Sequence, residues 1–319
     1  MIFIVASPGD DHAAAVTGLL EARGAPYLLF DTAGYPTKWQ LSVEYLEGVN
    51  RLWLRDLTRA QDIDLTTVTT AWWRRPQPLV LHPGINEAAT LQFTYNECIA
   101  ALSGLWEILP AFWINPPGFD EAAARKLYQL KVAASVGLRI PRTLVTNNPQ
   151  EARQFVGSVA SGQLIYKSFQ AIEQAWRETR LLSAEALDRL DDVKYAPVIF
   201  QEYIPATADL RVTIIGQQVF CIAVPIEQEH YAYDYRMNLG SVRAEPFRLP
   251  DTLKACLLQL MRSLHLVYGA IDLRYTPDGD YCFLEINPAG QWQFLEEKTD
   301  LRITDYFTRF LIDPDIPVE

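Results

Sequence analysis

Residues 269–288 read GAIDLRYTPDGDYCFLEINP, two alternating segments joined by a Pro-Asp-Gly-Asp turn. A turn centred on the Asp-Gly step sets Asp272 directly opposite Glu285, with Cβ atoms about 5 Å apart. Asn287 lies two residues beyond Glu285 and points to the same side of the strand. Two facing carboxylates destabilise a sheet unless a cation lies between them. The stretch therefore predicts a metal site made of Asp272, Glu285 and Asn287.

These hard oxygen ligands suit Mg²⁺, which binds a few carboxylates and completes its coordination with water and substrate phosphates. An alternative also fits the residues, because Arg274 shares the face of Asp272 and could neutralise it in a salt bridge. That alternative leaves Glu285 and Asn287 without a role. The metal prediction depends on the hairpin register, since a slip of one residue turns every side chain to the other face.

Two lysines have positions that favour an anionic ligand. Lys167 lies within the apolar stretch 163–169, where a buried ammonium needs a partner anion; a solvent-facing position is the alternative. Lys126 lies in a helix predicted over residues 121–136. Lys131 is roughly 140° around that helix from Lys126, so both cannot reach one ligand. A nucleotide phosphate would suit Lys126 and Lys167.

Two arginines extend this set. Arg211 lies in the alternating stretch 210–215, on the opposite side from its apolar residues, and Arg236 lies in the polar-aromatic loop 233–238. A planar guanidinium suits phosphate and acyl phosphate, although each arginine could instead form a structural ion pair. The chain has no Gly-x-x-x-x-Gly-Lys-Ser/Thr loop, no kinase loop set and no Gly-x-Ser-x-Gly motif. Cations beside magnesium ligands therefore predict phosphoryl transfer without a P-loop.

The order of strands and helices predicts three units. Residues 1–118 begin with a strand, a helix and a second strand, the βαβ start of an α/β domain. The sequence Asn-Pro-Pro-Gly at 115–118 marks the first boundary. Residues 119–196 form a small α+β unit, and residues 197–319 have the alternation of an antiparallel sheet.

Composition limits the function classes. The 319 residues carry a net charge of −11, with a pI near 4.9, and this argues against a nucleic-acid partner. The four cysteines lack the spacing of a zinc or redox motif and are expected to be reduced thiols. The N-terminus lacks the basic region of a signal peptide, and no apolar run approaches the ~18 residues of a membrane span. A cytoplasmic protein with no membrane partner is expected.

The ordered set of motifs resembles the ATP-grasp ligases. The helical Lys126 precedes GLRIPRT at 137–143, and the strand Lys167 precedes FQEYI at 200–204, DLR at 209–211, Asp272 and finally EINP at 285–288. The resemblance implies a chain of the α+β / α/β class with an ATP-grasp fold and an N-terminal α/β pre-ATP-grasp domain.

Within that superfamily the chain looks like the microviridin-type, or graspetide, ligases that close rings in peptides. The supporting stretches include AWWRRP at 71–76, YDYR at 233–236 and FLEINPAG at 283–290. The family implies that ATP phosphorylates an Asp or Glu side chain of a ribosomal precursor peptide. A Thr or Ser hydroxyl or a Lys amine of the same peptide then displaces phosphate, which closes a lactone or lactam.

The resemblance also assigns roles to individual residues, with ATP and Mg²⁺ as cofactors. Lys126 and Lys167 would hold phosphates, and Arg211 and Arg236 would contact the γ-phosphate and the acyl phosphate. Asp209 would touch ribose or substrate. The remaining cofactor-binding residues form the adenine-binding hinge, namely Gln201, Glu202, Tyr203 and Ile204. The implied partners are a precursor peptide with a leader and an acidic, hydroxyl-rich core, and a second copy of the chain in a homodimer.

Two other functions remain open. A ligase that joins amino acids or small acids, similar to the ribosomal-protein glutamate ligases, shares the ATP site. A non-catalytic nucleotide-binding subunit would tolerate Glu285→Gln. The chain also departs from the family pattern, because the lid stretch 170–176 has no glycine and Gln291 stands where the family often places an acid. The cluster at 72–75 fits either a leader-peptide contact or the end of a buried strand.

Overall fold

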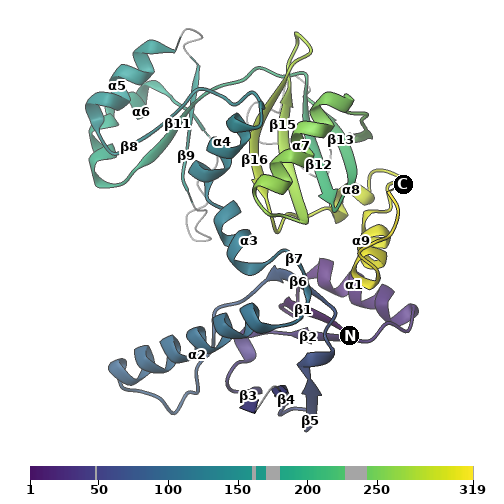
Figure 1. Ribbon diagram of the computed structural model, residues 1–319. Coiled ribbons are helices and arrows are strands. Elements are labelled where there is room, and N and C mark those ends of the chain that lie inside the picture. Colours follow the sequence, from purple (N-terminus) through teal and green to yellow (C-terminus); the bar gives the residue numbers. More distant parts are fainter. Residues whose placement is uncertain (47–48, 160–162, 170–179, 227–242, 319) are drawn as a thin grey trace.

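The computed structural model describes residues 1–46, 49–159, 163–169, 180–226 and 243–318, whose strands form four sheets (Figure 1). One sheet belongs to the N-terminal part of the chain, one to the middle part and one to the C-terminal part. The fourth is a three-stranded excursion from the N-terminal part. Mixed helices and sheets are as predicted for an ATP-grasp chain with an N-terminal α/β domain.

The N-terminal sheet is parallel with strand order β2-β1-β6-β7. Its strands are β1 (Ile2–Ala6), β2 (Tyr27–Phe30), β6 (Thr70–Arg75) and β7 (Phe112–Ile114). Every residue of β1 is buried, which explains its unbroken apolar sequence. Helix α1 (Asp11–Ala22) follows β1, and the Asp10 carboxylate caps it by accepting from the Ala13 N–H.

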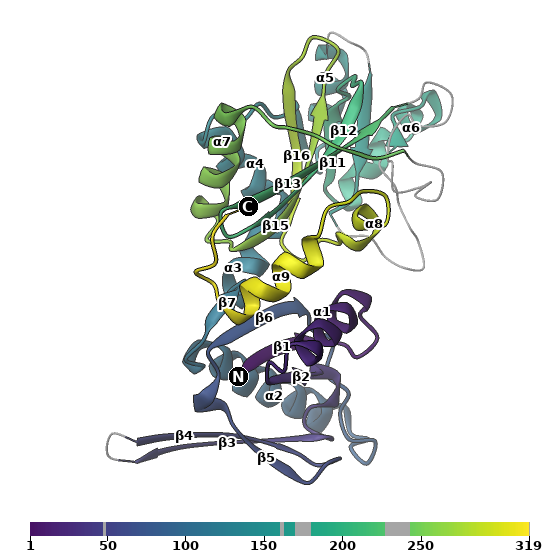
Figure 2. The same ribbon diagram turned by 90° about the vertical axis from the view of Figure 1, so that its right-hand side faces the viewer.

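The excursion consists of β3 (Trp39–Leu46), β4 (Val49–Asp56) and β5 (Gln61–Asp64), which lie at the end of the molecule farthest from the C-terminal sheet (Figure 2). Helix α2 (Ala88–Ile108) lies between β6 and β7 in the chain. The described residues also contain three short 3₁₀ turns, Thr32–Gly34, Leu65–Thr67 and Leu190–Tyr195.

The middle sheet has the order β10-β9-β11-β8. Its strands are β8 (Thr143–Thr146), β9 (Leu164–Lys167), β10 (Arg180–Leu181) and β11 (Val198–Glu202), and it carries the helices α5 (Pro149–Ser158) and α6 (Ala184–Asp188). The predicted boundary at residue 196 thus separates β11 from the sheet in which it pairs with β8 and β9. The alternation of apolar and polar residues predicts that β11 is a strand. It does not predict which strands β11 pairs with, because β8 and β9 are distant from it in sequence.

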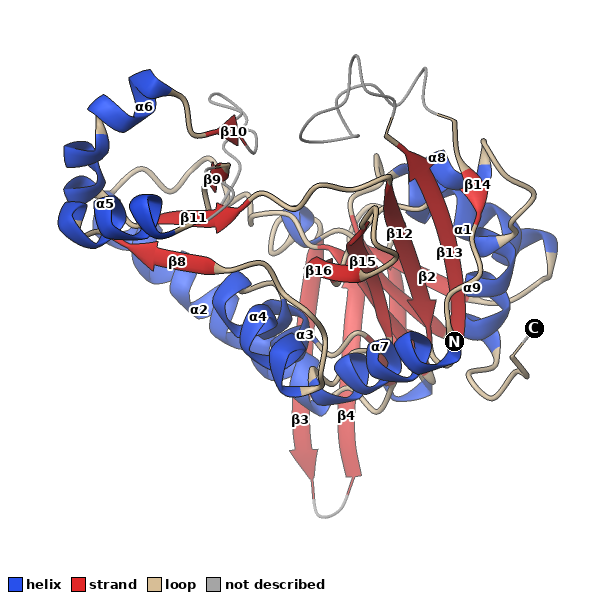
Figure 3. Cartoon of the chain, turned by 90° about the horizontal axis from the view of Figure 1, so that it is seen from above, coloured by secondary structure: helices blue, strands red, loops and turns tan. Residues whose placement is uncertain are grey.

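The C-terminal sheet is antiparallel with the order β14-β13-β12-β15-β16. Its strands are β12 (Ala208–Ile215), β13 (Gln218–Pro225), β14 (Glu245–Pro246), β15 (Tyr268–Tyr275) and β16 (Tyr281–Asn287). Helix α7 (Asp251–Ser263) covers its apolar face, where Leu257 and Leu260 pack with Val212 and Ile271. Seen from above, the middle sheet lies beside this sheet with α4 (Lys126–Ser135) between them (Figure 3).

The chain ends in α8 (Gln293–Glu296) and α9 (Ile303–Ile312). Helix α9 lies between the N-terminal and C-terminal sheets (Figure 2). Its Phe307 is fully buried in a core that also contains Ile4 and Val16 of the N-terminal unit and Trp292. The two ends of the chain therefore share one hydrophobic core. None of the helices in the described ranges is long and apolar enough to cross a bilayer.

Candidate active site

The polar face of the C-terminal sheet carries the predicted metal ligands. In β12 the residues Leu210, Val212 and Ile214 pack into the core under α7, so Asp209 and Arg211 face the other way. The register places Arg211 beside Asp272 and Asp209 beside Arg274. Alternation alone thus separates an apolar face from a charged one.

The register of the last hairpin confirms that Asp272 lies opposite Glu285. The prediction assumed a regular hairpin with a turn centred on Asp278-Gly279, whereas the observed pairing depends on an irregularity in the strands. Near the turn the pairs are Tyr275 with Tyr281 and Leu273 with Phe283, which by themselves would set Asp272 opposite Leu284. The register shifts between Asp272 and Leu273. A bulge at Leu284 therefore restores the predicted pairing. It also puts Leu284 and Glu285, two consecutive residues, into the same pocket.

Among the described residues, three ion pairs lie on this face. Arg211 Nη1 donates to Asp272 Oδ1 at 2.8 Å, and Arg274 Nε donates to Asp209 Oδ1 at 2.9 Å. These four side chains are almost fully buried. The salt bridge considered between Arg274 and Asp272 is therefore wrong, because each acid pairs with the arginine directly opposite it on the neighbouring strand.

The third pair joins the predicted phosphate ligand to the predicted metal ligand. Lys126 Nζ donates to Glu285 Oε2 at 2.6 Å, with the two side chains 24% and 22% exposed. The single helix predicted over 121–136 is instead two, α3 (Pro117–Ala123) and α4, and Lys126 is the first residue of α4. The break between them sets Lys126 at a helix N-terminus, against β16.

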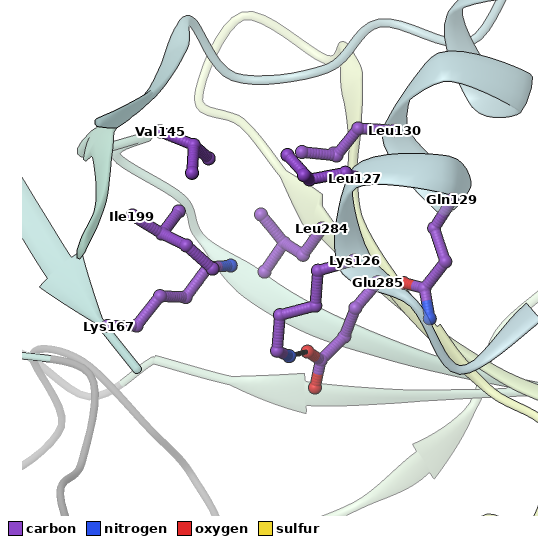
Figure 4. A pocket seen from close by; sticks show the side chains of 9 residues that line it. All are labelled: Lys126, Leu127, Gln129, Leu130, Val145, Lys167, Ile199, Leu284 and Glu285. Atoms are coloured by element: carbon purple, nitrogen blue, oxygen red, sulfur yellow. Dashed lines mark hydrogen bonds and ion pairs between the residues drawn. The ribbon is translucent and has the colours of Figure 1, made fainter. Parts of the chain in front are cut away.

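One small pocket is lined by Lys126, Lys167 and Glu285, among other residues (Figure 4). Lys167 is the last residue of β9 and extends into the pocket from the middle sheet, while Lys126 and Glu285 enter from α4 and β16. The rest of the lining is Leu127, Gln129, Leu130, Val145, Ile199 and Leu284. A pocket with apolar walls and two cations suits a ligand with a flat apolar part and anionic groups.

The predicted hinge follows Ile199 along β11. Gln201 is 1% exposed, and its Nε2 donates to Thr143 Oγ1 at 2.9 Å, while within the described residues its Oε1 has no hydrogen-bond partner. The Glu202 and Tyr203 N–H groups donate to Arg142 and Gln163 carbonyls. Ile204 is buried, and the Tyr203 ring lies 5.6 Å from the Arg274 guanidinium carbon. The pocket lining includes none of these four hinge residues.

Two predicted features lie outside the described residues, namely Arg236 and the lid stretch 170–176. The cluster at 72–75 is described, and it matches the end of a buried strand. Trp72 and Arg74 are each 1% exposed. Arg74 Nε bonds the Asp10 carboxylate at 3.2 Å, and its Nη1 donates to the Ala289 and Gly290 carbonyls.

The oxygen donors fit Mg²⁺. Asp272 and Glu285 supply carboxylates, and Asn287 adds an amide oxygen on the same side of β16, a donor set that Mg²⁺ prefers. Among the described residues no three His, Cys, Asp or Glu side chains gather as a metal cluster. A magnesium ion held here would therefore also need substrate phosphate or water, as Mg²⁺ sites commonly do.

Sequence reasoning missed the Leu284 bulge and the Arg74 contacts. The bulge has a signal in the sequence, because residues 281–284 (YCFL) are all apolar, so strict alternation fails within 281–287. The contacts of Arg74 with the Ala289 and Gly290 carbonyls have no comparable signal, since these backbone groups lie more than two hundred residues away in sequence.

Two family models together match most of the chain. Residues 1–120 match the MvdD pre-ATP grasp domain, and residues 123–310 match the RimK-like ATP-grasp domain. Among curated proteins, a probable alpha-L-glutamate ligase of Sodalis glossinidius is 24% identical over 214 residues, which cover 65% of this chain and 70% of that protein.

Similar solved structures extend over nearly the whole chain. The macrocyclase MdnC of Microcystis aeruginosa MRC, bound with precursor peptide MdnA, is 31% identical with a TM-score of 0.85, covering 98% of this chain and 99% of that one. A Chryseobacterium gregarium RiPP-associated ATP-grasp ligase, in complex with ADP and a leader and core peptide, is 26% identical with a TM-score of 0.88 and coverage of 99% and 97%. The ATP-grasp ligase PsnB, complexed with minimal precursor, Mg and ADP, is 26% identical with a TM-score of 0.76 and coverage of 98% and 96%.

Proposed function

This chain belongs to the RimK-like ATP-grasp family, and we propose that it is a peptide macrocyclase that uses ATP to close side-chain rings in a precursor peptide. The observation that carries the proposal is similarity along the whole chain. The match to MdnC covers 98% of this chain, including the N-terminal unit, whereas the glutamate-ligase match covers 65%. A ligase for amino acids or small acids is the second candidate, because the probable alpha-L-glutamate ligase is 24% identical over 65% of this chain.

The proposed reaction has two steps. A side-chain carboxylate of the peptide attacks the γ-phosphorus of ATP, which gives an acyl phosphate and ADP. A hydroxyl or amine of the same peptide then attacks the acyl carbon, phosphate leaves, and the nucleophile loses its proton. Each ring therefore removes one water from the peptide overall.

The residues divide this work between them. Lys126 and Lys167 would bind phosphates, and Asp272, Glu285 and Asn287 would hold Mg²⁺, which neutralises charge on the transferring phosphoryl group. Arg211 and Arg236 would hold the γ-phosphate and the acyl phosphate. The hinge from Gln201 to Ile204 would hold adenine, with Asp209 near ribose. The convergence of Lys126, Lys167 and Glu285 on one pocket supports the roles of these three residues.

Four further expectations complete the proposal. The functional division of the chain is 1–118, 119–196 and 197–319, with β11 contributing to the middle sheet. The substrate carries a leader and an acidic, hydroxyl-rich core, and the protein works in the cytoplasm. Two copies of the chain are expected to associate as a homodimer.

Incubation of the protein with a candidate precursor, ATP and Mg²⁺ tests the function. Such a precursor would be encoded beside this gene and would repeat Thr or Ser and Asp or Glu near its C-terminus. Intact mass spectrometry should show a loss of about 18 Da for each ring, because one water leaves per bond. A mass gain with an added amino acid would favour the second candidate. An unchanged mass with folded protein would contradict both.

A Lys126→Gln variant should raise the KM for ATP about tenfold or more, because a charge-assisted hydrogen bond to phosphate is worth about 1.5–3 kcal/mol. Lys131→Gln is the matched control, since Lys131 is exposed on the same helix and lies outside the pocket lining. Steady-state ADP release measures both variants. Equal KM values for the two would remove Lys126 from the phosphate site.

A further inference from the structure

The segment Pro288–Gln293, here called the 288–293 loop, follows Asn287 directly and is held by side chains along its whole length. Four consecutive carbonyls accept hydrogen bonds: Pro288 from Asn115 Nδ2 at 3.2 Å, Ala289 from Arg74 Nη1 at 2.7 Å, Gly290 from Arg74 Nη1 at 3.0 Å and Tyr268 Oη at 2.8 Å, and Gln291 from Arg211 Nη2 at 3.2 Å. The Trp292 and Gln293 N–H groups both donate to His12 Nε2.

Four of the side chains that hold this loop come from the N-terminal unit, namely His12, Arg74, Arg75 and Asn115, and all but Arg75 are buried. His12 lies in α1, Arg74 in β6, and Asn115 directly after β7, with exposures of 3%, 1% and 1%. Burial, followed by the nearby Arg74 charge, lowers the pKa of His12 to about 3, so its imidazole is neutral and Nε2 can accept. Asn115 Oδ1 also accepts from the Val267 and Tyr268 N–H groups at the start of β15.

The loop is connected in turn to the proposed magnesium and phosphate ligands. Asn287 Oδ1 accepts from the Ala289 N–H at 2.9 Å, so the loop orients that amide. A Cβ on Gly290 would lie 2.4 Å from Ala270 Cβ and 2.9 Å from Arg211 Nη2. The loop backbone therefore packs directly on Arg211, which pairs with Asp272. Displacement of the loop would move Asn287 and Arg211 together.

We propose that Arg74, with Asn115 and His12, is a positioning residue through which the N-terminal unit sets the geometry of the Mg²⁺ and phosphate ligands. The inference rests on the proposed function, because it uses the metal site of that proposal. The N-terminal unit thus serves the reaction by fixing the backbone beside Asn287 and Arg211. Replacement of side chains that orient metal ligands commonly lowers metal affinity or activity by about 10- to 100-fold.

Calorimetric titration of the protein with Mg·ADP tests this without any peptide. Arg74→Gln should raise the Kd for Mg·ADP about tenfold to a hundredfold, the range found when residues that support metal ligands are replaced. Arg75→Gln is a milder second variant, because Arg75 is only half-buried and its Nη2 donates to the Ala289 carbonyl at 3.3 Å. It should raise the Kd about two- to tenfold, the worth of one ordinary hydrogen bond.

Arg23→Gln is the matched control. Arg23 also joins the N-terminal unit to the C-terminal end of the chain, through Asp305 of α9, yet it touches no residue of the 288–293 loop. The Kd of the Arg23→Gln variant for Mg·ADP should equal the wild-type value, even where the substitution lowers the melting temperature. An unchanged Kd in a folded Arg74→Gln variant, or equal weakening by Arg23→Gln, would overturn the inference.

Two other results are decisive. If Arg74→Gln does not fold, Arg75→Gln decides, and a wild-type Kd in that variant would overturn the inference. If the wild-type protein fails to bind Mg·ADP, the proposed function itself is wrong, and the inference falls with it. Weakened binding in both loop-contacting variants together with an unchanged control supports it.

Discussion

A Glu285→Gln variant is expected to fold normally and to lose kcat by about 10²–10³-fold, because the proposed anionic magnesium ligand is replaced by a neutral amide of the same shape. The Lys126–Glu285 pair is about one-quarter exposed, so its loss should change stability by only about 0–1 kcal/mol. ADP release and the mass of a precursor peptide measure the activity, and thermal unfolding measures the stability.

Asp280→Asn is the control for this variant. Asp280 precedes β16 in the same hairpin, and it pairs with Arg139 at 3.1 Å with a 64% exposed side chain. Removal of that carboxylate should leave ADP release within about twofold of wild type, since exposed pairs contribute little. Full activity in Glu285→Gln would instead favour a nucleotide-binding subunit without catalysis.

An Arg211→Met variant is expected to lose both stability and activity. Arg211 and Asp272 form a buried pair with side chains 6% and 11% exposed, and removal of one partner leaves an uncompensated charge at a cost of about 3–5 kcal/mol. Chemical denaturation measures that loss. The activity should fall as well, because the guanidinium is also the proposed partner of the transferred phosphoryl group.

The double variant Arg211→Met/Asp272→Asn separates the two effects. Replacing both charges removes the uncompensated carboxylate, so stability should recover by about 1–4 kcal/mol relative to Arg211→Met. Activity should remain lost, since a proposed magnesium ligand and a proposed phosphate ligand are both absent. Recovery of ADP release along with stability would mean that Arg211 and Asp272 serve only the fold.

The sequence predicted those parts of the site that depend on local pattern. Alternation in β12 and β15 correctly predicted that Arg211 and Asp272 point away from the apolar core, because side-chain direction alternates along a strand. The pairing of Asp272 with Glu285 was also correct, although it needs the bulge at Leu284. Counting symmetrically outward from the turn gives Glu285 as the partner of Asp272. The observed register, which contains the bulge, gives the same partner.

Other features depend on contacts that sequence separation hides. The Asp209–Arg274 pair requires β12 and β15 to be neighbours, and α7 intervenes between them in the chain. The place of β11 between β9 and β8 likewise follows from strand pairing across the middle unit. The break between α3 and α4 lies at Ala124-Arg125, two good helix formers, so intrinsic propensity gave no warning of it.

The Lys126–Glu285 contact has a thermodynamic consequence for ligand binding. Without ligands, Lys126 neutralises the carboxylate that is proposed to bind Mg²⁺. A nucleotide that draws Lys126 toward its phosphates releases Glu285 for the metal, and a metal that takes Glu285 releases Lys126. Binding of either ligand thus breaks the Lys126–Glu285 ion pair, so the other ligand then binds without the free-energy cost of breaking it. Nucleotide and magnesium should therefore bind with positive heterotropic cooperativity, with equal coupling free energy in both directions.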